Sequence, residues 1–116
     1  RSRRQRQMCI RDSMAAFCGQ KMVGVASMRS INHISLLFVD SKYHKKGIGT
    51  ELVHSLRELV LVEGRRTSLT VNAAPYATGF YHKIGFTDTD RMCTKEGISY
   101  TPMEWTFASF TGNPTD

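Results

Sequence analysis

The chain has 116 residues, of which 41% are hydrophobic and 22% are charged, and its formal net charge at pH 7 is +6. This length suits one compact domain and leaves no room for a second, and no apolar stretch approaches the roughly eighteen residues that a membrane-spanning helix needs. Three widely spaced cysteines without a CxxC pair indicate neither a disulfide framework nor a zinc site. We therefore expect a cytoplasmic protein with no metal site and no membrane partner.

Most of the positive charge lies at the N-terminus. Residues 1–13, RSRRQRQMCIRDS, carry five arginines against one aspartate, so +4 of the net +6 is found here. We interpret this segment as a disordered basic tail or as non-native sequence read through from a sequencing adapter, with an RNA-binding arm as a third alternative. Since the rest of the chain is nearly balanced in charge, we expect no nucleic-acid partner. A chain starting near Ser13 should then fold as well as the full chain.

The first elements after this segment are strands. Apolar runs at 14–17 and 22–28 flank CGQK, in which Gly19 can supply the positive φ of a tight turn, so we predict a β-hairpin. The next segment, HISLLFVD at 33–40, is apolar on four successive residues, which predicts a central strand buried on both faces.

A helix should follow the loop HKKGIGT at 44–50. Apolar residues recur at helical spacing from Ile48 to about residue 63, and Gly64 stands where a glycine would end the helix. The β-branched, alternating segment TSLTV at 67–71 then predicts another strand. Together with the strand at 33–40, these elements form a βαβ unit.

The last third of the chain predicts a short helix and two strands. Pro75 can begin a helix in which Tyr76, Phe80 and Ile84 recur at four-residue intervals, and Gly85 closes it. Strands at 85–92 and 97–110 then flank a turn, with Pro102 suggesting an edge or a bulge. The sum is a mixed α/β domain over 14–110 with an N-terminal hairpin, a central βαβ unit, a short helix and a C-terminal β-hairpin. Residues 111–116 form a C-terminal tail.

The glycine loop is the strongest functional signal. Gly47 and Gly49 stand at the start of a helix after a strand, where backbone N–H groups and the helix dipole favour an anion. Lys45 and Lys46 add charge and Thr50 adds a hydroxyl. The structural alternative is a tight turn with solvated lysines. The P-loop pattern is absent, and the dinucleotide fingerprint fails because a leucine follows where a small residue is required.

The pattern that remains, [Q/R]xxGx[G/A], resembles the GNAT family of acetyl-CoA-dependent N-acetyltransferases. Residues 44–49, HKKGIG, match it except that His44 replaces the usual glutamine or arginine. TVNAAPYATGFYHKIGF at 70–86 is similar to the family's second signature, with its matching positions at Asn72, Tyr81, Gly85 and Phe86. The ending GISYTPMEW also resembles many bacterial members, so the resemblance covers nearly everything from Met14 onward.

The resemblance implies a GNAT-like mixed sheet that holds acetyl-CoA as cosubstrate. The diphosphate of coenzyme A would lie on the loop, and the pantetheine arm would pair with strand backbone between two splayed strands. The acetyl thioester would lie beside Asn72, with Tyr81 as general acid for the thiolate that leaves. The implied cosubstrate-binding residues are Phe38, Val39, His44, Lys45, Lys46, Gly47, Ile48, Gly49, Thr50 and Asn72. A primary amine would accept the acetyl group, and His33 is a weak candidate for its general base.

Family members usually carry a first strand and one or two helices before the hairpin, where this chain has only residues 1–13. We therefore expect an N-terminally truncated chain whose acceptor amine cannot be identified from sequence. The alternatives are a non-catalytic acyl-CoA-binding module and an inactive fragment that retains the cofactor half. A missing first strand would also expose a sheet edge, which favours aggregation or a homodimer.

Overall fold

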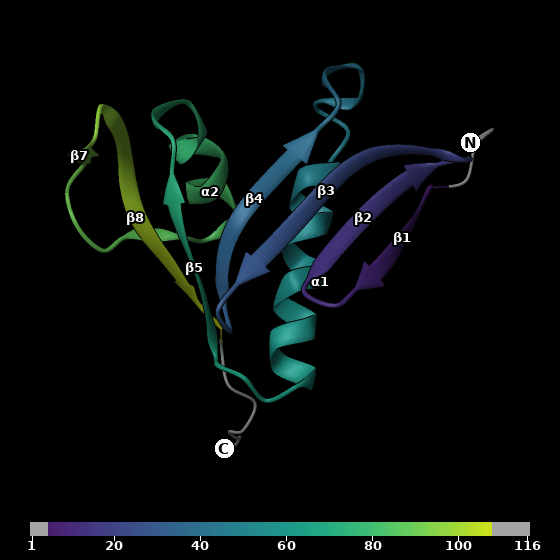
Figure 1. Ribbon diagram of the computed structural model, residues 1–116, viewed down its shortest axis with the longest axis horizontal. Helices are drawn as coiled ribbons and strands as arrows, with labels where there is room; N and C mark the ends of the chain where they lie inside the picture. The colour runs from purple at the N-terminus through teal and green to yellow at the C-terminus, as the bar shows by residue number, and fades with distance from the viewer. Residues whose placement is uncertain (1–4, 108–116) are drawn as a thin grey trace.

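The computed structural model describes residues 5–107, and these form one mixed β-sheet with two α-helices (Figure 1). The strand order is β1-β2-β3-β4-β5-β8-β6, and β7 pairs with β8. Neither of these helices is long and apolar enough to cross a membrane. The elements are β1 (Gln5–Ile10), β2 (Ser13–Cys18), β3 (Lys21–Arg29), β4 (His33–Val39), the 3₁₀ turn η1 (Ser41–Tyr43), α1 (Ile48–Val62), β5 (Ser68–Ala73), the 3₁₀ turn η2 (Pro75–Ala77), α2 (Thr78–Ile84), β6 (Thr87–Asp88), β7 (Cys93–Lys95) and β8 (Ile98–Thr106).

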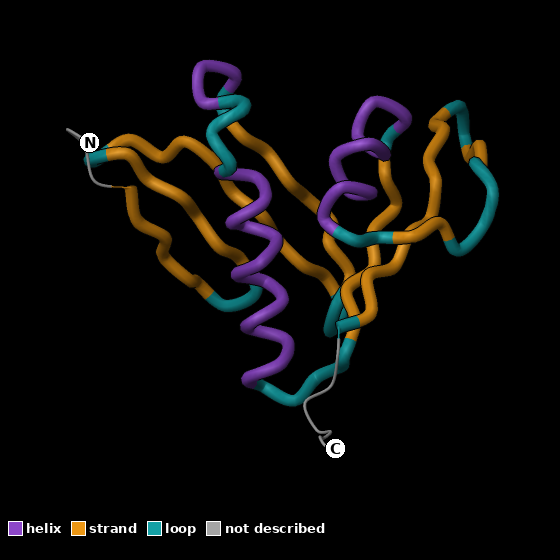
Figure 2. Tube along the Cα trace, turned by 180° about the vertical axis from the view of Figure 1, so that it is seen from behind, coloured by secondary structure: helices purple, strands orange, loops and turns teal. Residues whose placement is uncertain are grey.

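The predicted α/β architecture is confirmed, including the hairpin of β2 and β3 and the βαβ unit of β4, α1 and β5. Helix α1 lies along one face of the sheet, as the view from behind shows (Figure 2). It buries one stripe of side chains in the main core, namely Ile48, Leu52, Val53, Leu56 and Val60. The helix approaches β3 closely because Gly24 has no side chain. A Cβ there would lie 3.1 Å from the Cδ1 atom of Leu52.

Strand β4 is central, as predicted, but the prediction that both of its faces are buried is wrong. Ile34 is buried and Leu37 packs against the core, whereas Leu36 and Phe38 are 48% and 57% exposed. Within the described residues, α1 covers one face of this part of the sheet (Figure 2), and no element covers the other (Figure 1). A run of apolar residues shows that a strand is apolar on both sides, but the coverage of each side depends on other elements.

The central strands β4 and β5 are parallel but pair at one end only. The register joins His33 to Thr70 and Ile34 to Val71, and one further bond runs from the Thr70 N–H to the Asn32 carbonyl at 3.0 Å. Beyond Ile34 the strands diverge, so the two halves of the sheet separate toward the end where α1 begins (Figure 2). This opening places the glycine loop, the end of β4 and the start of α2 around one space.

The N-terminal segment differs from its prediction. We placed residues 1–13 outside the fold, whereas Gln5–Ile10 forms β1, an edge strand paired antiparallel with β2. Two side-chain contacts tie this segment to the rest: Ser55 donates a hydrogen bond to Gln7, and Arg65 forms an ion pair with Asp12 at 2.7 Å. Residues 1–4 of the expected tail lie outside the described residues, as do 108–110 of the last predicted strand and the C-terminal tail at 111–116.

Removing residues 1–12 should lower thermal stability without preventing folding. The described core side chains all come from residues after this segment, so the remaining domain keeps its core. The β1 ladder and the Arg65–Asp12 pair are lost, and each kcal/mol lost lowers Tm by about 4–8 °C in a domain of this size. The freed edge of β2 should also promote self-association. Circular dichroism melts and gel filtration test this; an unchanged Tm and monomeric elution would show that β1 contributes nothing.

At the C-terminal end, the predicted hairpin is formed by β7 and β8, and β6 pairs farther along β8. Pro102 was predicted to mark an edge or a bulge, but β8 lies between β5 and the pair β6 and β7. Proline is tolerated there because Pro102 lies between the residues of β8 that pair with β6 and those that pair with β7. Its missing N–H therefore breaks no hydrogen bond of either pairing. Its carbonyl accepts a hydrogen bond from the Thr89 N–H at 2.9 Å.

Candidate functional site

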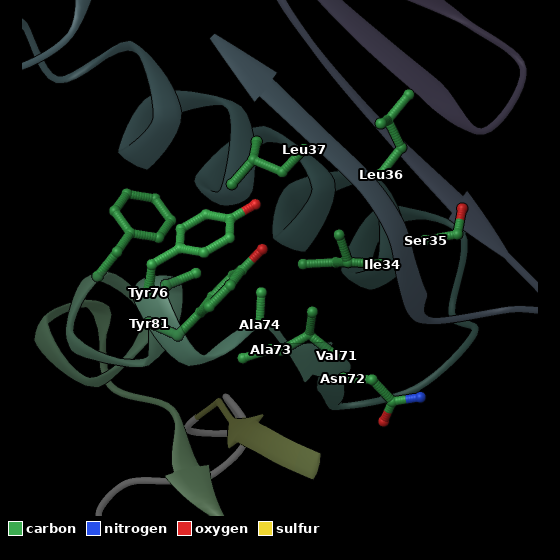
Figure 3. Close-up of a pocket in the computed structure, with 12 residues that line it drawn as sticks. Ile34, Ser35, Leu36, Leu37, Val71, Asn72, Ala73, Ala74, Tyr76 and Tyr81 are labelled. Carbon is green, nitrogen blue, oxygen red and sulfur yellow. The ribbon is translucent and has the colours of Figure 1, made fainter. Parts of the chain in front are cut away.

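Two hollows lie in the opening between the diverging strands. The first, of about 180 Å³, lies between β4, β5 and the start of α2 and is lined by residues that include Ile34, Leu37, Asn72, Phe80 and Tyr81 (Figure 3). The second, of about 430 Å³, lies at the end of β4 and is lined by Leu37, Phe38, Val39, Asp40, Ser41, His44 and Tyr76. Together they extend from the glycine loop to the point where β4 and β5 separate.

The glycine loop gives α1 an N-terminus without a side-chain cap. Gly47 is the N-cap residue, and its φ of 80° and ψ of 5° lie in the left-handed region, which other residues enter only with strain. The N–H groups of the first helical residues have no partner within a helix, and here no capping side chain accepts from them. Those groups belong to Ile48, Gly49 and Thr50. The loop therefore presents backbone donors that suit an anion.

Gly49 is required for packing rather than for its backbone conformation. A Cβ at this position would lie 3.2 Å from the ring of Phe80 and 3.7 Å from a methyl carbon of Val39. Both neighbours belong to the walls of the opening. The two glycines therefore have different roles, with Gly47 setting the turn and Gly49 letting α1 approach α2 and β4.

The basic side chains of the glycine loop are exposed to solvent. Lys45 and Lys46 are exposed, and Lys45 itself has a positive φ of 65°. His44 is also exposed, but its Nε2 lies 2.8 Å from the Val39 carbonyl oxygen. Because a carbonyl can only accept, Nε2 carries the hydrogen in this contact. His44 thus joins the loop to the end of β4 instead of pointing at the helix N-terminus.

The backbone of β4 offers hydrogen-bonding groups to the opening at alternate residues. The Asp40 N–H donates to the Val23 carbonyl at 2.8 Å, and Phe38 pairs with Val25, so the backbone groups of both face β3. Those of Leu37 and Val39 face the opposite way, toward the opening. Of the two residues expected from sequence to pair with a ligand through backbone, only Val39 points its groups there, and its carbonyl is taken by His44.

Tyr81 is a buried aromatic residue at the inner end of the first hollow. Its side chain is 5% exposed and makes edge-to-face contacts with Phe80 and Phe86, at centroid distances of 5.0 and 5.1 Å. Burial, with a smaller effect of Tyr76, raises the pKa of Tyr81 to about 12. Figure 3 shows the hydroxyls of Tyr76 and Tyr81 pointing toward β4 across the opening. The phenol is therefore protonated at neutral pH and faces the space where the strands part.

Asn72 and His33 do not join Tyr81. Asn72 lines the first hollow, but its exposed side chain points away from the tyrosine rings (Figure 3). His33 lies where β4 and β5 still pair, and its Nδ1 is 2.7 Å from the Thr70 hydroxyl. Burial and then the charge of Arg29 lower the pKa of His33, so its neutral form is favoured. It is absent from the residues that line either hollow.

Sequence reasoning missed Tyr76. We grouped it with Phe80 and Ile84 as one stripe of a helix, but Tyr76 is 93% exposed and lines both hollows. Its place on a 3₁₀ turn, three residues per turn, breaks the helical phase with the residues of α2. The signal that could have found it is Pro75 next to an aromatic residue at the end of a strand. In residues 5–107, no group of three His, Cys, Asp or Glu side chains could hold a metal ion.

Comparison with known proteins identifies the family. The model of the acetyltransferase (GNAT) domain family matches residues 4–107. No curated protein sequence matches the chain. Among solved structures, a GCN5-related N-acetyltransferase from Rhodopseudomonas palustris is 27% identical with a TM-score of 0.74, and the match covers 87% of this chain and 62% of that one. This chain therefore spans less than two thirds of the length of that relative.

Two further structures share the fold at lower identity. PaiA N-acetyltransferase from Thermoplasma acidophilum, solved in complex with coenzyme A, is 19% identical with a TM-score of 0.67, covering 82% of this chain and 60% of that one. An aminoglycoside 6′-N-acetyltransferase complexed with coenzyme A is 18% identical with a TM-score of 0.72, covering 86% and 74%.

Proposed function

The chain belongs to the GNAT acetyltransferase family, and on that premise we propose that the protein transfers an acetyl group from acetyl-CoA to a primary amine. The observation that carries the proposal is that the hollow beside Tyr81 and the hollow at the end of β4 share Leu37 and Tyr76, and that His44 of the glycine loop lines the second. The uncapped start of α1, the two hollows and the buried Tyr81 hydroxyl therefore lie around the opening between β4 and β5.

The loop suits the diphosphate of coenzyme A. The backbone donors of Ile48, Gly49 and Thr50 and the positive end of the α1 dipole favour a polyanion, while Lys45 and Lys46 add charge at the rim. His44 would hold the loop against β4 through its bond to Val39. The Val39 N–H and the backbone groups of Leu37 would pair with the amides of the pantetheine arm.

The inner hollow suits the reacting group. When bound, acetyl-CoA supplies a thioester whose acetyl group passes to the amine, with coenzyme A released as a thiol. The amine must lose a proton and the sulfur must gain one. Tyr81 would donate the proton at the sulfur, and Asn72 would lie at the edge of the hollow. We assign no residue as the base for the amine.

Thermal shift and thiol release test this function and separate it from its main alternative. Acetyl-CoA at 100 times its Kd should stabilise the protein by about 2.7 kcal/mol, hence raise Tm by several degrees. A panel of amines should then release free thiol. No shift would exclude the proposal, and a shift without thiol release would favour a non-catalytic acyl-CoA-binding module or an inactive fragment.

We also propose a reducing, cytoplasmic location and no nucleic-acid partner. The three cysteines are free, and Cys18 is buried in the core. A chain that passes through an oxidising compartment would expose such thiols to disulfide formation. The high positive charge of residues 1–13 is the feature that would argue otherwise, so an oligonucleotide belongs in the thermal-shift assay as a control. A Tm increase with it would contradict this part of the proposal.

A further inference from the structure

The two hollows meet between two side chains. Leu37 and Tyr76 line both of them, and the two residues lie on opposite sides of the opening, Leu37 on β4 and Tyr76 on η2. A molecule that occupies both hollows would therefore lie against Leu37 and Tyr76. These two side chains mark the junction of the two hollows.

The two side chains differ in how they are held. Leu37 packs against the hydrophobic core, whereas the Tyr76 side chain is 93% exposed and is not among the residues packed there. The backbone beneath Tyr76 is fixed by Pro75 and by the hydrogen bond from the Ala77 N–H to the Ala74 carbonyl at 2.8 Å. An exposed ring on a fixed backbone can change rotamer on a nanosecond timescale. Tyr76 is therefore a free aromatic group at a defined position.

We propose that Tyr76 is a positioning residue that packs its ring over the extended arm of acyl-CoA at the junction of the two hollows. This inference rests on the proposed function. An aromatic ring that is almost fully exposed in the free protein has apolar surface left to bury, and the arm passing below it would cover that surface. Leu37 would contact the arm from the other side. The ring would then hold the thioester within reach of Tyr81.

The expected effect of removing the ring depends on the ligand. Acetyl-CoA spans both the loop and the arm, whereas adenosine 3′-phosphate 5′-diphosphate keeps the diphosphate and lacks the arm. Tyr76→Ala should weaken acetyl-CoA binding by about tenfold, the effect of losing a partly buried aromatic contact. It should leave the Kd of the nucleotide unchanged. Tyr76→Phe keeps the ring and should bind both ligands as the wild type does.

Isothermal titration calorimetry of the full chain measures these constants. Val62→Ala is the matched control, because Val62 is an exposed apolar side chain, 80% exposed, at the far end of α1. An equal loss of affinity for both ligands in Tyr76→Ala would overturn the proposal, because it would show that the substitution disturbs the glycine loop. So would an unchanged Kd for acetyl-CoA, or a Tyr76→Phe variant as weak as Tyr76→Ala. A wild-type chain that binds neither ligand would instead contradict the proposed function itself.

Discussion

Replacing Gly47 with valine should weaken acetyl-CoA binding by about 5- to 150-fold. Gly47 has a φ of 80° at the N-cap of α1, and a β-branched residue held in that region costs about 1–3 kcal/mol. In the free protein the loop would relax to avoid this strain. Binding would then have to restore the strained turn that directs the amides of α1 toward the diphosphate. Since 1.4 kcal/mol corresponds to a factor of ten, a cost of about 1–3 kcal/mol lowers the affinity by about 5- to 150-fold.

The lysines provide the comparison that decides between a backbone cradle and a charge patch. Replacing Lys45 and Lys46 together with alanine removes two exposed charges, which salt screens, so the loss should be smaller than that of Gly47→Val at physiological ionic strength. Titration calorimetry at 0.15 M salt measures both, 0.15 M being about the physiological value. If the double lysine variant bound more weakly, the backbone would not be the main determinant.

Gly64→Val separates a local effect from a general loss of stability. Gly64 lies just beyond the other end of α1 and has a φ of 64°, and a Cβ added there would meet no atom within 4 Å, as is also true of Gly47. Valine is disfavoured by the positive φ at both sites, so Gly64→Val introduces the same kind of change at the opposite end of the helix. Only Gly47→Val should lose affinity for acetyl-CoA.

The features that were predicted correctly from the sequence are those that depend on residues close together in the chain. The helix from Ile48 and its glycine stop followed from apolar spacing and one positive φ, and α1 with Gly64 confirms both. The start of α1 directly after Gly47 followed from the same local rules. The βαβ unit followed from the order of elements, and that order brings the loop close to the diverging ends of β4 and β5.

Features that depend on distant contacts were not predictable. The exposure of Leu36 and Phe38 depends on which elements cover the sheet, and the bond from His44 to Val39 depends on the path of the loop after η1. Tyr76 was misplaced because a helical period was applied across a 3₁₀ turn. The charge of residues 1–13 suggested a tail, yet β-pairing uses backbone groups that every residue carries, and β1 forms from them.

Burial makes the hydroxyl of Tyr81 a weak acid that keeps its proton above neutral pH. Because burial raises its pKa to about 12, the phenol stays protonated across the range in which an exposed tyrosine, with a pKa near 10, would lose its proton. As the proposed acid must be protonated to act, turnover should show no loss from this group between about pH 8 and pH 10.5. A higher pKa also makes it a poorer donor. The same apolar surroundings make a thiolate more basic, which favours the transfer.

Changing Tyr81 to phenylalanine should lower turnover by roughly 10²-fold or more while leaving the affinity for acetyl-CoA nearly unchanged. The ring remains, so the edge-to-face contacts with Phe80 and Phe86 and the walls of the hollow are kept, and only the proton donor is lost. Tyr100→Phe, which removes a hydroxyl from β8 outside both hollows, is the matched control and should have wild-type turnover. Thiol release under saturating acetyl-CoA and amine measures turnover, and calorimetry measures affinity. Near-normal turnover in Tyr81→Phe would show that the sulfur takes its proton from water instead.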